Sequence, residues 1–162
     1  MATLAEPDLI EALAAGGARV SNDPATLDLF AHDIFSRGAD LAAVVHPVDT
    51  ASLAAAVKAA SGRGLTVVPR GGGMSYTGGY TLGQKGGVLF DTATMSRILD
   101  INETDMTVTV EAGCTWAALH EALRPRGLRT PFWGTLSGIH ATVGGGMRQN
   151  GIFRGTGRSG AA

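Results

Sequence analysis

Glycine is concentrated in a few short stretches of this chain, and these stretches constrain the fold more than any other feature. The sequence contains 24 glycines among 162 residues, well above the roughly 7% of average usage. They gather at 71–79, 83–87, 144–146 and 151–160. Scattered glycines would weaken helices and strands, whereas clustered glycines indicate loops with unusual main-chain geometry. The fold must therefore hold several such loops.

Regular elements are predicted around the first glycine stretch. An apolar run at 41–46, a helix after Asp49 that ends near Gly62, and a strand at 65–69 form a βαβ unit. The other predicted elements are helices at 7–15 and 24–31, a buried strand at 86–92, an antiparallel hairpin from 97–101 and 106–113, and an amphipathic helix at 115–127. After Val143 we expect no stable element, so we predict a truncated chain of the α+β class.

The loop with the sequence PRGGGMSYTGG, residues 69–79, directly follows the second strand of the βαβ unit. Three consecutive glycines from Gly71 permit positive φ and leave successive main-chain N–H groups unshielded. A concave run of such donors suits a phosphate or a pyrophosphate. Ser75 and Thr77 add hydroxyl groups. An ordinary connection is the alternative, but such a connection rarely needs five glycines.

A second glycine cluster lies in SGIHATVGGGMRQNG, residues 137–151. Here we expect Gly144 to Gly146 to offer further exposed N–H groups beside polar side chains. Two such loops can hold a long diphosphate from two sides. The string GTGRSG at 155–160 matches a dinucleotide fingerprint, but no strand precedes it and no helix follows it. A nicotinamide-binding module is therefore a weaker alternative.

Composition excludes several other classes of protein. The net charge of −1 gives no basic field for nucleic acid, and no apolar stretch is long enough for a membrane span. Cys114 is the single cysteine, so no internal disulfide and no metal cluster is expected. Without a signal-peptide pattern, a cytoplasmic location is predicted. His46, at a strand end, is interpreted as a surface or hydrogen-bonded histidine rather than a catalyst.

The order of these segments resembles the FAD-binding domain of the FAD-linked oxidases of the vanillyl-alcohol oxidase and p-cresol methylhydroxylase (PCMH) type. The similarity runs from about Ala42 to the end, through PRGGG, ILDI, TVTVEAG and ATVGG with QNG. It implies a PCMH-type fold for 41–162, preceded by a helical segment at 1–40. It also implies a FAD-dependent oxidase or dehydrogenase, in which FAD takes a hydride from an alcohol or 2-hydroxy acid and passes electrons to oxygen or a carrier.

The resemblance assigns cofactor-binding residues position by position. The first segment, whose main chain would hold the FAD pyrophosphate, comprises Arg70, Gly71, Gly72, Gly73, Met74 and Ser75. The second segment, which would line the diphosphate and the inner edge of the flavin, comprises Ser137, Thr142, Gly144, Gly145, Asn150 and Gly151. No catalytic residue and no metal ligand is assigned, because most proton-transferring residues of the family lie in a later substrate domain.

One position departs from some members of the family. Where those members carry a histidine that bonds covalently to the flavin, this chain has Met74. Methionine cannot form that bond, so attachment at the 70–75 loop is expected to be non-covalent, while attachment from another region stays open. The alternative function is a noncatalytic flavin-binding subunit or fragment that needs a second chain or a cap domain for activity.

Overall fold

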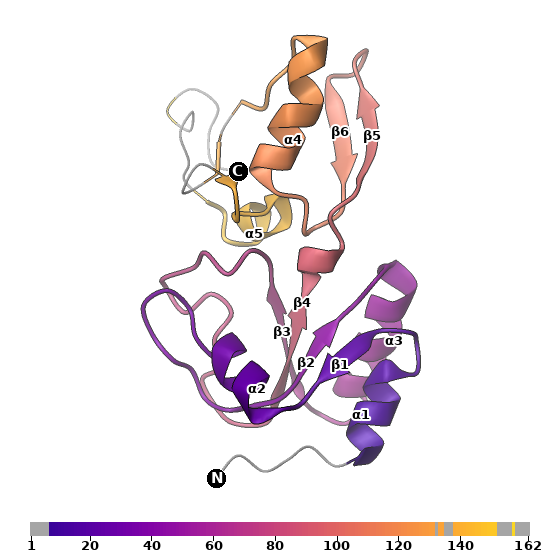
Figure 1. The fold of residues 1–162 in the computed structure, drawn as a ribbon, viewed down its shortest axis with the longest axis vertical. Coiled ribbons are helices and arrows are strands. Elements are labelled where there is room, and N and C mark those ends of the chain that lie inside the picture. Colours follow the sequence, from indigo (N-terminus) through magenta and orange to yellow (C-terminus); the bar gives the residue numbers. More distant parts are fainter. Residues whose placement is uncertain (1–6, 132, 135–137, 152–156, 158–162) are drawn as a thin grey trace. The chain divides into compact units, whose positions relative to one another are not determined.

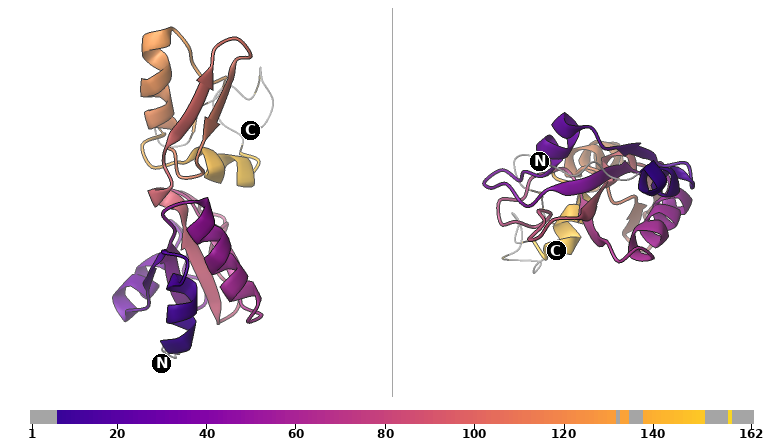
Figure 2. Two further views of the ribbon diagram at one scale, coloured as in Figure 1. Left: turned by 90° about the vertical axis from the view of Figure 1, so that its right-hand side faces the viewer. Right: turned by 90° about the horizontal axis from the view of Figure 1, so that it is seen from below.

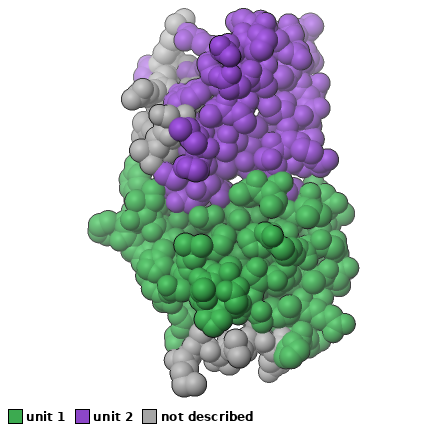
Figure 3. All heavy atoms as spheres, viewed as in Figure 1, with its two compact units in different colours: residues 1–70, 75–94 green, residues 71–74, 95–162 purple. Residues whose placement is uncertain are grey.

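The computed structural model describes residues 7–131, 133–134, 138–151 and 157 (Figure 1). They divide into two compact units (Figure 3). Unit 1 comprises 1–70 and 75–94, and unit 2 comprises 71–74 and 95–162. The first glycine loop is thus shared, since 71–74 belong to unit 2 and the residues from Ser75 onward belong to unit 1.

Unit 1 is built on a four-stranded sheet in the order β1-β2-β4-β3. Its strands are β1 (Arg19–Ser21), β2 (Leu41–His46), β3 (Thr66–Arg70) and β4 (Gly87–Asp91). β1 is antiparallel to β2, whereas β4 runs parallel to both β2 and β3. The predicted strands on either side of the βαβ helix are confirmed, but β4 inserts between them. Every residue of β4 is buried, which suits a central strand.

Helices cover both faces of this sheet (Figures 1 and 2). α1 (Pro7–Ala14) and α3 (Thr50–Ser61) pack with Val45, Val88 and Phe90 on one face. α2 (Pro24–Phe30) packs with Val44 and Leu89 on the other. Successive strand residues point to opposite faces, so the apolar residues of β2 and β4 supply two cores at once.

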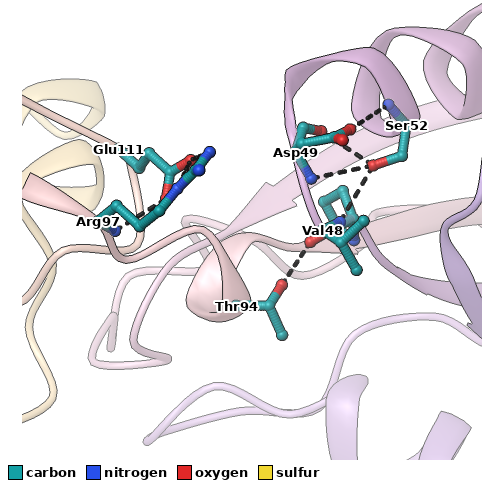
Figure 4. A network of polar contacts seen from close by, with 7 residues as sticks. Val48, Asp49, Ser52, Thr94, Arg97 and Glu111 are labelled. Atoms are coloured by element: carbon teal, nitrogen blue, oxygen red, sulfur yellow. Dashed lines mark hydrogen bonds and ion pairs between the residues drawn. The ribbon is translucent and has the colours of Figure 1, made fainter. Parts of the chain in front are cut away.

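The start of α3 is determined locally. Asp49 accepts a hydrogen bond from the Ser52 N–H, and the Ser52 hydroxyl accepts one from the Asp49 N–H (Figure 4). This reciprocal pair is a capping box, which satisfies main-chain donors that a helix leaves unpaired at its first turn. The predicted helix after Asp49 is therefore confirmed, with Asp49 as its N-cap.

Unit 2 contains the predicted hairpin and its helix. β5 (Ile98–Asn102) pairs antiparallel with β6 (Thr107–Val110), and α4 (Trp116–Leu123) packs its Leu119 and Leu123 against them (Figure 2). An ion pair joins Arg97 to Glu111 with 2.7 Å between Nη2 and Oε1, next to the hairpin (Figure 4). Short 3₁₀ turns occupy Thr92–Thr94, in unit 1, and Arg124–Arg126. The mixed α+β class is as predicted.

One expectation was wrong: a helix does form after residue 142. α5 (Val143–Arg148) contains three consecutive glycines, which are poor helix formers. Thr142 caps it by accepting a hydrogen bond from the Gly145 N–H at 3.1 Å. A Cβ on Gly144 would lie 2.7 Å from the Ala112 carbonyl oxygen. Capping and close packing thus outweigh the low propensity.

No helix in the described part of the chain is long and apolar enough to cross a membrane. Within the same residues, no three or more His, Cys, Asp or Glu side chains gather as a metal site.

Candidate functional site

Arg70 ends β3 and introduces the glycine loop. β3 lies at the edge of the sheet, where Pro69 costs no ladder hydrogen bond. The Arg70 guanidinium carbon lies 4.7 Å from the centre of the Phe30 ring and 5.4 Å from that of Tyr80. Its Nη1 lies 3.4 Å from Oδ1 of Asp91. The side chain is therefore directed into unit 1, and only its main chain continues into the loop.

Asp91 connects Arg70 to a buried histidine. The Nδ1 atom of His46 lies 3.3 Å from Oδ2 of Asp91, and both side chains are less than 10% exposed. Burial lowers the pKa of His46 below its usual value, and although the Asp91 carboxylate raises it, burial prevails. The ends of β2, β3 and β4 thus carry one charge cluster, which we call the strand-end cluster: His46, Arg70 and Asp91.

The lowered pKa of His46 predicts a specific pH dependence of stability. An unfolded histidine titrates near pH 6.5, so below that pH the unfolded chain binds a proton that the folded chain resists. We expect the free energy of unfolding to decrease as the pH falls from about 7.5 to 5.5, by up to about 1.4 kcal/mol per pH unit. Urea unfolding at several pH values measures this slope. His46→Gln is expected to flatten it, and an unchanged slope in that variant would contradict the assignment.

Gly71 and Gly72 form the part of the loop that packs most closely in unit 2. A Cβ on Gly72 would overlap the carbonyl oxygen of His140 and lie 2.5 Å from its carbonyl carbon. A Cβ on Gly71 would overlap Oγ1 of Thr142 and lie 3.6 Å from the Gly145 Cα. Only residues without a side chain fit here. The loop main chain therefore lies directly against the segment from His140 to Gly145.

This packing leaves hydrogen-bond donors available in the loop. Within the described residues, the N–H groups of Gly71 and Gly72 donate to no other group. Gly73 follows with φ 70°, in the left-handed region, and such reversals of handedness produce main-chain nests that bind anions. Gly71 to Ser75 are half-buried, whereas residues 76–78 are exposed. The arrangement can offer two neighbouring donors to a phosphate oxygen.

The second glycine segment does not offer the exposed N–H groups that its sequence predicts. The Gly144 N–H donates to the Ala112 carbonyl, the Gly145 N–H to the Thr142 hydroxyl, and the Gly146 N–H to the Thr142 carbonyl. The first turn of α5 and its Thr142 cap use the Gly145 and Gly146 donors, and the Ala112 carbonyl takes the Gly144 donor. Gly145 and Thr142 therefore form the surface against which Gly71 lies, whereas Gly144 packs against Ala112.

The other predicted site residues lie in different surroundings. Met74 is half-buried in the loop of unit 2. The Ser75 hydroxyl, in unit 1, accepts hydrogen bonds from the N–H groups of Thr77 and Gly79. Asn150 has φ 46°, just after α5, and the Gly151 N–H donates to the Gly146 carbonyl. Ser137 lies outside the described residues, as does the GTGRSG string except Gly157.

Sequence reasoning overlooked two acidic residues near the loop. Asp91 falls within the predicted strand 86–92, and the sequence gives no signal that distinguishes Asp33 as a residue of the site. Asp33 is 8% exposed, and its Oδ2 accepts a 2.8 Å hydrogen bond from the Gly78 N–H. A buried carboxylate is not recognisable from composition, although DIFS at 33–36 has the Asp and Ser of a local turn.

Comparison with known proteins identifies the family of domains in which these glycine segments occur. A family model described as an FAD binding domain matches residues 41–162. This match covers most of the chain and includes both glycine segments. The chain belongs to this family of FAD-binding domains. The family resemblance of the glycine segments is thereby confirmed, and FAD is the cofactor.

Two curated relatives and one solved structure illustrate the similarity. The chain is 35% identical over 102 residues to the mitochondrial D-lactate dehydrogenase (cytochrome) of Arabidopsis thaliana, covering 63% of this chain and 17% of that protein. It is 29% identical over 133 residues to D-2-hydroxyglutarate dehydrogenase of Xanthomonas citri pv. viticola, covering 82% and 28%. An alkyldihydroxyacetonephosphate synthase structure shares the fold, with a TM-score of 0.83 and 16% identity, covering 99% and 35%. The chain thus spans less than a third of either curated relative.

The loop residues fit an FAD diphosphate. The group carries negative charge and needs close main-chain approach, which the side-chain-free Gly71 and Gly72 permit. Bound FAD would supply the redox chemistry, while this chain's residues would hold and orient it.

Proposed function

We propose that this chain is the part of a FAD-dependent oxidoreductase that binds the FAD diphosphate, and that the whole protein oxidises an alcohol or 2-hydroxy acid. One observation carries the binding role: the N–H groups of Gly71 and Gly72 have no acceptor in the described residues, while their main chain lies against His140 and Thr142. Two adjacent donors without a protein acceptor, on half-buried main chain, are suited to an anionic partner.

The role of each segment follows from its contacts. The N–H groups of Gly71 and Gly72 would donate to the diphosphate oxygens. Thr142 and Gly145 would keep the loop main chain in place, because both lie against Gly71 and Thr142 caps α5. Gly144 would support them indirectly, through its close packing against Ala112. The strand-end cluster would hold Arg70, from which the loop begins. None of these residues needs to transfer a proton.

The proposed substrate class comes from the names of the relatives. D-lactate and D-2-hydroxyglutarate are both 2-hydroxy acids. A member of this class would lose a hydride from its carbinol carbon to the flavin and a proton from its hydroxyl to a base, giving the 2-oxo acid. No residue described here is assigned as that base.

A binding measurement tests the proposal. Purified protein mixed with FAD and passed through gel filtration is expected to elute with absorbance near about 370 and 450 nm, as oxidised flavins show. Acid precipitation then tests the non-covalent attachment that Met74 predicts at the 70–75 loop: release of the colour into the supernatant supports it. A protein that stays colourless after incubation with excess FAD would refute the proposed function.

The alternative function is supported by the coverage of the relatives, since the chain matches 17% and 28% of their lengths. In that case the chain binds FAD but needs a further segment or second chain to act on a substrate. Adding D-lactate or D-2-hydroxyglutarate to the FAD-loaded protein distinguishes the two. Bleaching near 450 nm supports the complete enzyme, and stable colour supports the alternative.

A further inference from the structure

The glycine loop continues into a turn that depends on a residue far away in the sequence. This turn, residues 75–79, belongs to unit 1. Asp33, in the segment after α2, accepts a hydrogen bond at its Oδ2 from the Gly78 N–H. The neighbouring Ile34 N–H donates to the Ser75 carbonyl at 3.0 Å. The 33–34 segment thus holds both ends of the turn.

The two carboxylate oxygens of Asp33 have separate partners. Oδ1 accepts from the N–H groups of Phe35 and Ser36, at 2.8 and 2.6 Å, which closes a local turn. Oδ2 is left for Gly78 at 2.8 Å. The hydrogen bonds lower the pKa of Asp33 below its usual value, with the Ser36 N–H as the largest cause. The carboxyl group is therefore ionised at neutral pH and acts as an acceptor on both sides.

We propose that Asp33 is a positioning residue for the cofactor, which holds the 75–79 turn so that the preceding glycines are arranged for the FAD diphosphate before it binds. Glycine loses more conformational freedom than any other residue when it becomes ordered. A glycine loop that is fixed at both ends loses less of this freedom on binding, which increases affinity. Arg70 fixes one end through Asp91, and Asp33 with Ile34 fixes the other.

Asp33 precedes the segment that matches the family model, 41–162. The inference thus assigns a role to a residue outside that match. The expected effect of Asp33 on FAD affinity rests on the proposed function, whereas the role of Asp33 in holding the 75–79 turn does not.

The test uses Asp33→Asn in the full chain. Asparagine supports the same local turn through its Oδ1, but it places an NH₂ donor opposite the Gly78 N–H. The variant should therefore lose the Gly78 hydrogen bond and keep the turn. The matched control is Asp23→Asn, since Asp23 also accepts from an N–H three residues later, that of Thr26, but caps α2 and has no recorded contact with 75–79.

Two measurements are made on each variant. For Asp33→Asn we expect about tenfold weaker FAD binding in a flavin fluorescence titration, and about tenfold faster hydrogen exchange at the Gly78 amide. The amides of Leu89 and Phe90 in β4 should keep their wild-type exchange rates, which separates positioning from general destabilisation. Asp23→Asn should leave FAD affinity and Gly78 exchange unchanged.

Each outcome decides the question. If the Gly78 amide exchanges at the wild-type rate in Asp33→Asn, the hydrogen bond between Gly78 and Asp33 does not protect this amide and the proposal is wrong. If the amide exchanges faster but FAD affinity is unchanged, Asp33 holds the turn but does not position the loop for FAD. If the wild-type protein fails to bind FAD, the proposed function fails, and Gly78 exchange still decides whether Asp33 holds the turn. If Asp33→Asn does not fold, the hydrogen bond is tested in the wild-type protein. The Gly78 amide should then exchange its hydrogen at least about tenfold more slowly than the amide of Gly83, which has nothing within 4 Å of its Cβ position. Equal exchange rates would refute the contact between Asp33 and Gly78.

Discussion

Replacing Gly72 by alanine is expected to weaken FAD binding by about a hundredfold. The added Cβ would overlap the His140 carbonyl oxygen and lie 3.3 Å from the Ala141 nitrogen. These are main-chain atoms, which cannot rotate away, so either the loop or the 140–142 segment must shift. Overpacking of this kind costs about 3 kcal/mol at the upper end, which corresponds to about a hundredfold in affinity. Isothermal titration with FAD measures the loss.

Two further alanine variants make this prediction specific. Gly71→Ala is expected to have a smaller effect, because its Cβ would meet the Thr142 hydroxyl, a side-chain atom that can rotate at the expense of the α5 cap. Gly83→Ala is the matched control: nothing lies within 4 Å of its Cβ position, and its φ is not in the left-handed region. FAD affinity should therefore decrease in the order Gly83→Ala, Gly71→Ala, Gly72→Ala. Equal affinities would show that the loop tolerates side chains and does not approach a ligand closely.

Replacing Asp91 by asparagine is expected to lower the free energy of unfolding by about 3 kcal/mol. Its carboxylate is 9% exposed and faces Arg70 on one side and His46 on the other. The Nε atom of Arg70 is already buried without a hydrogen-bond partner in the described residues. Removing the negative charge leaves a largely buried guanidinium with no counter-ion. The change is measured by urea unfolding at pH 7.5.

The control for Asp91→Asn is Asp8→Asn. Asp8 also forms an ion pair with an arginine, since its Oδ2 lies 3.1 Å from Nη2 of Arg63. This distance is shorter than the 3.4 Å between Oδ1 of Asp91 and Nη1 of Arg70. Asp8 is 81% exposed, however, so solvent screens its charge and little stability should be lost. A similar loss in both variants would mean that burial does not govern the strand-end cluster.

Local elements of unit 1 could be predicted from the sequence because their signals lie within a few residues. The capping box of α3 needs only Asp49 and Ser52, and the uninterrupted apolar run of β2 indicates burial on both faces. The order of the glycine segments likewise indicated the family and its cofactor, because such loops demand residues without side chains at particular positions. The non-covalent loop follows from Met74 alone.

The insertion of β4 between β2 and β3 could not be predicted in this way. All three strands contain an apolar run, and such a run does not by itself distinguish a central from an edge strand. Pro69 was the available clue, since proline is found at sheet edges. The helix α5 was missed because the low propensity of its three glycines hides a cap and a close contact with Ala112, 32 residues before Gly144 in the sequence.

By itself, the sequence determined most of the helices and strands before residue 143, the position of the first glycine loop, and the family of FAD-binding domains to which the chain belongs. The tertiary structure alone decided which main-chain donors are left for a ligand. It assigns the Gly144 N–H to Ala112 and leaves those of Gly71 and Gly72 without an acceptor in the described residues. It also brings Asp33 to Gly78 across 45 residues. The physical reason is that a glycine permits many conformations, and only packing and hydrogen bonds from distant segments select one of them.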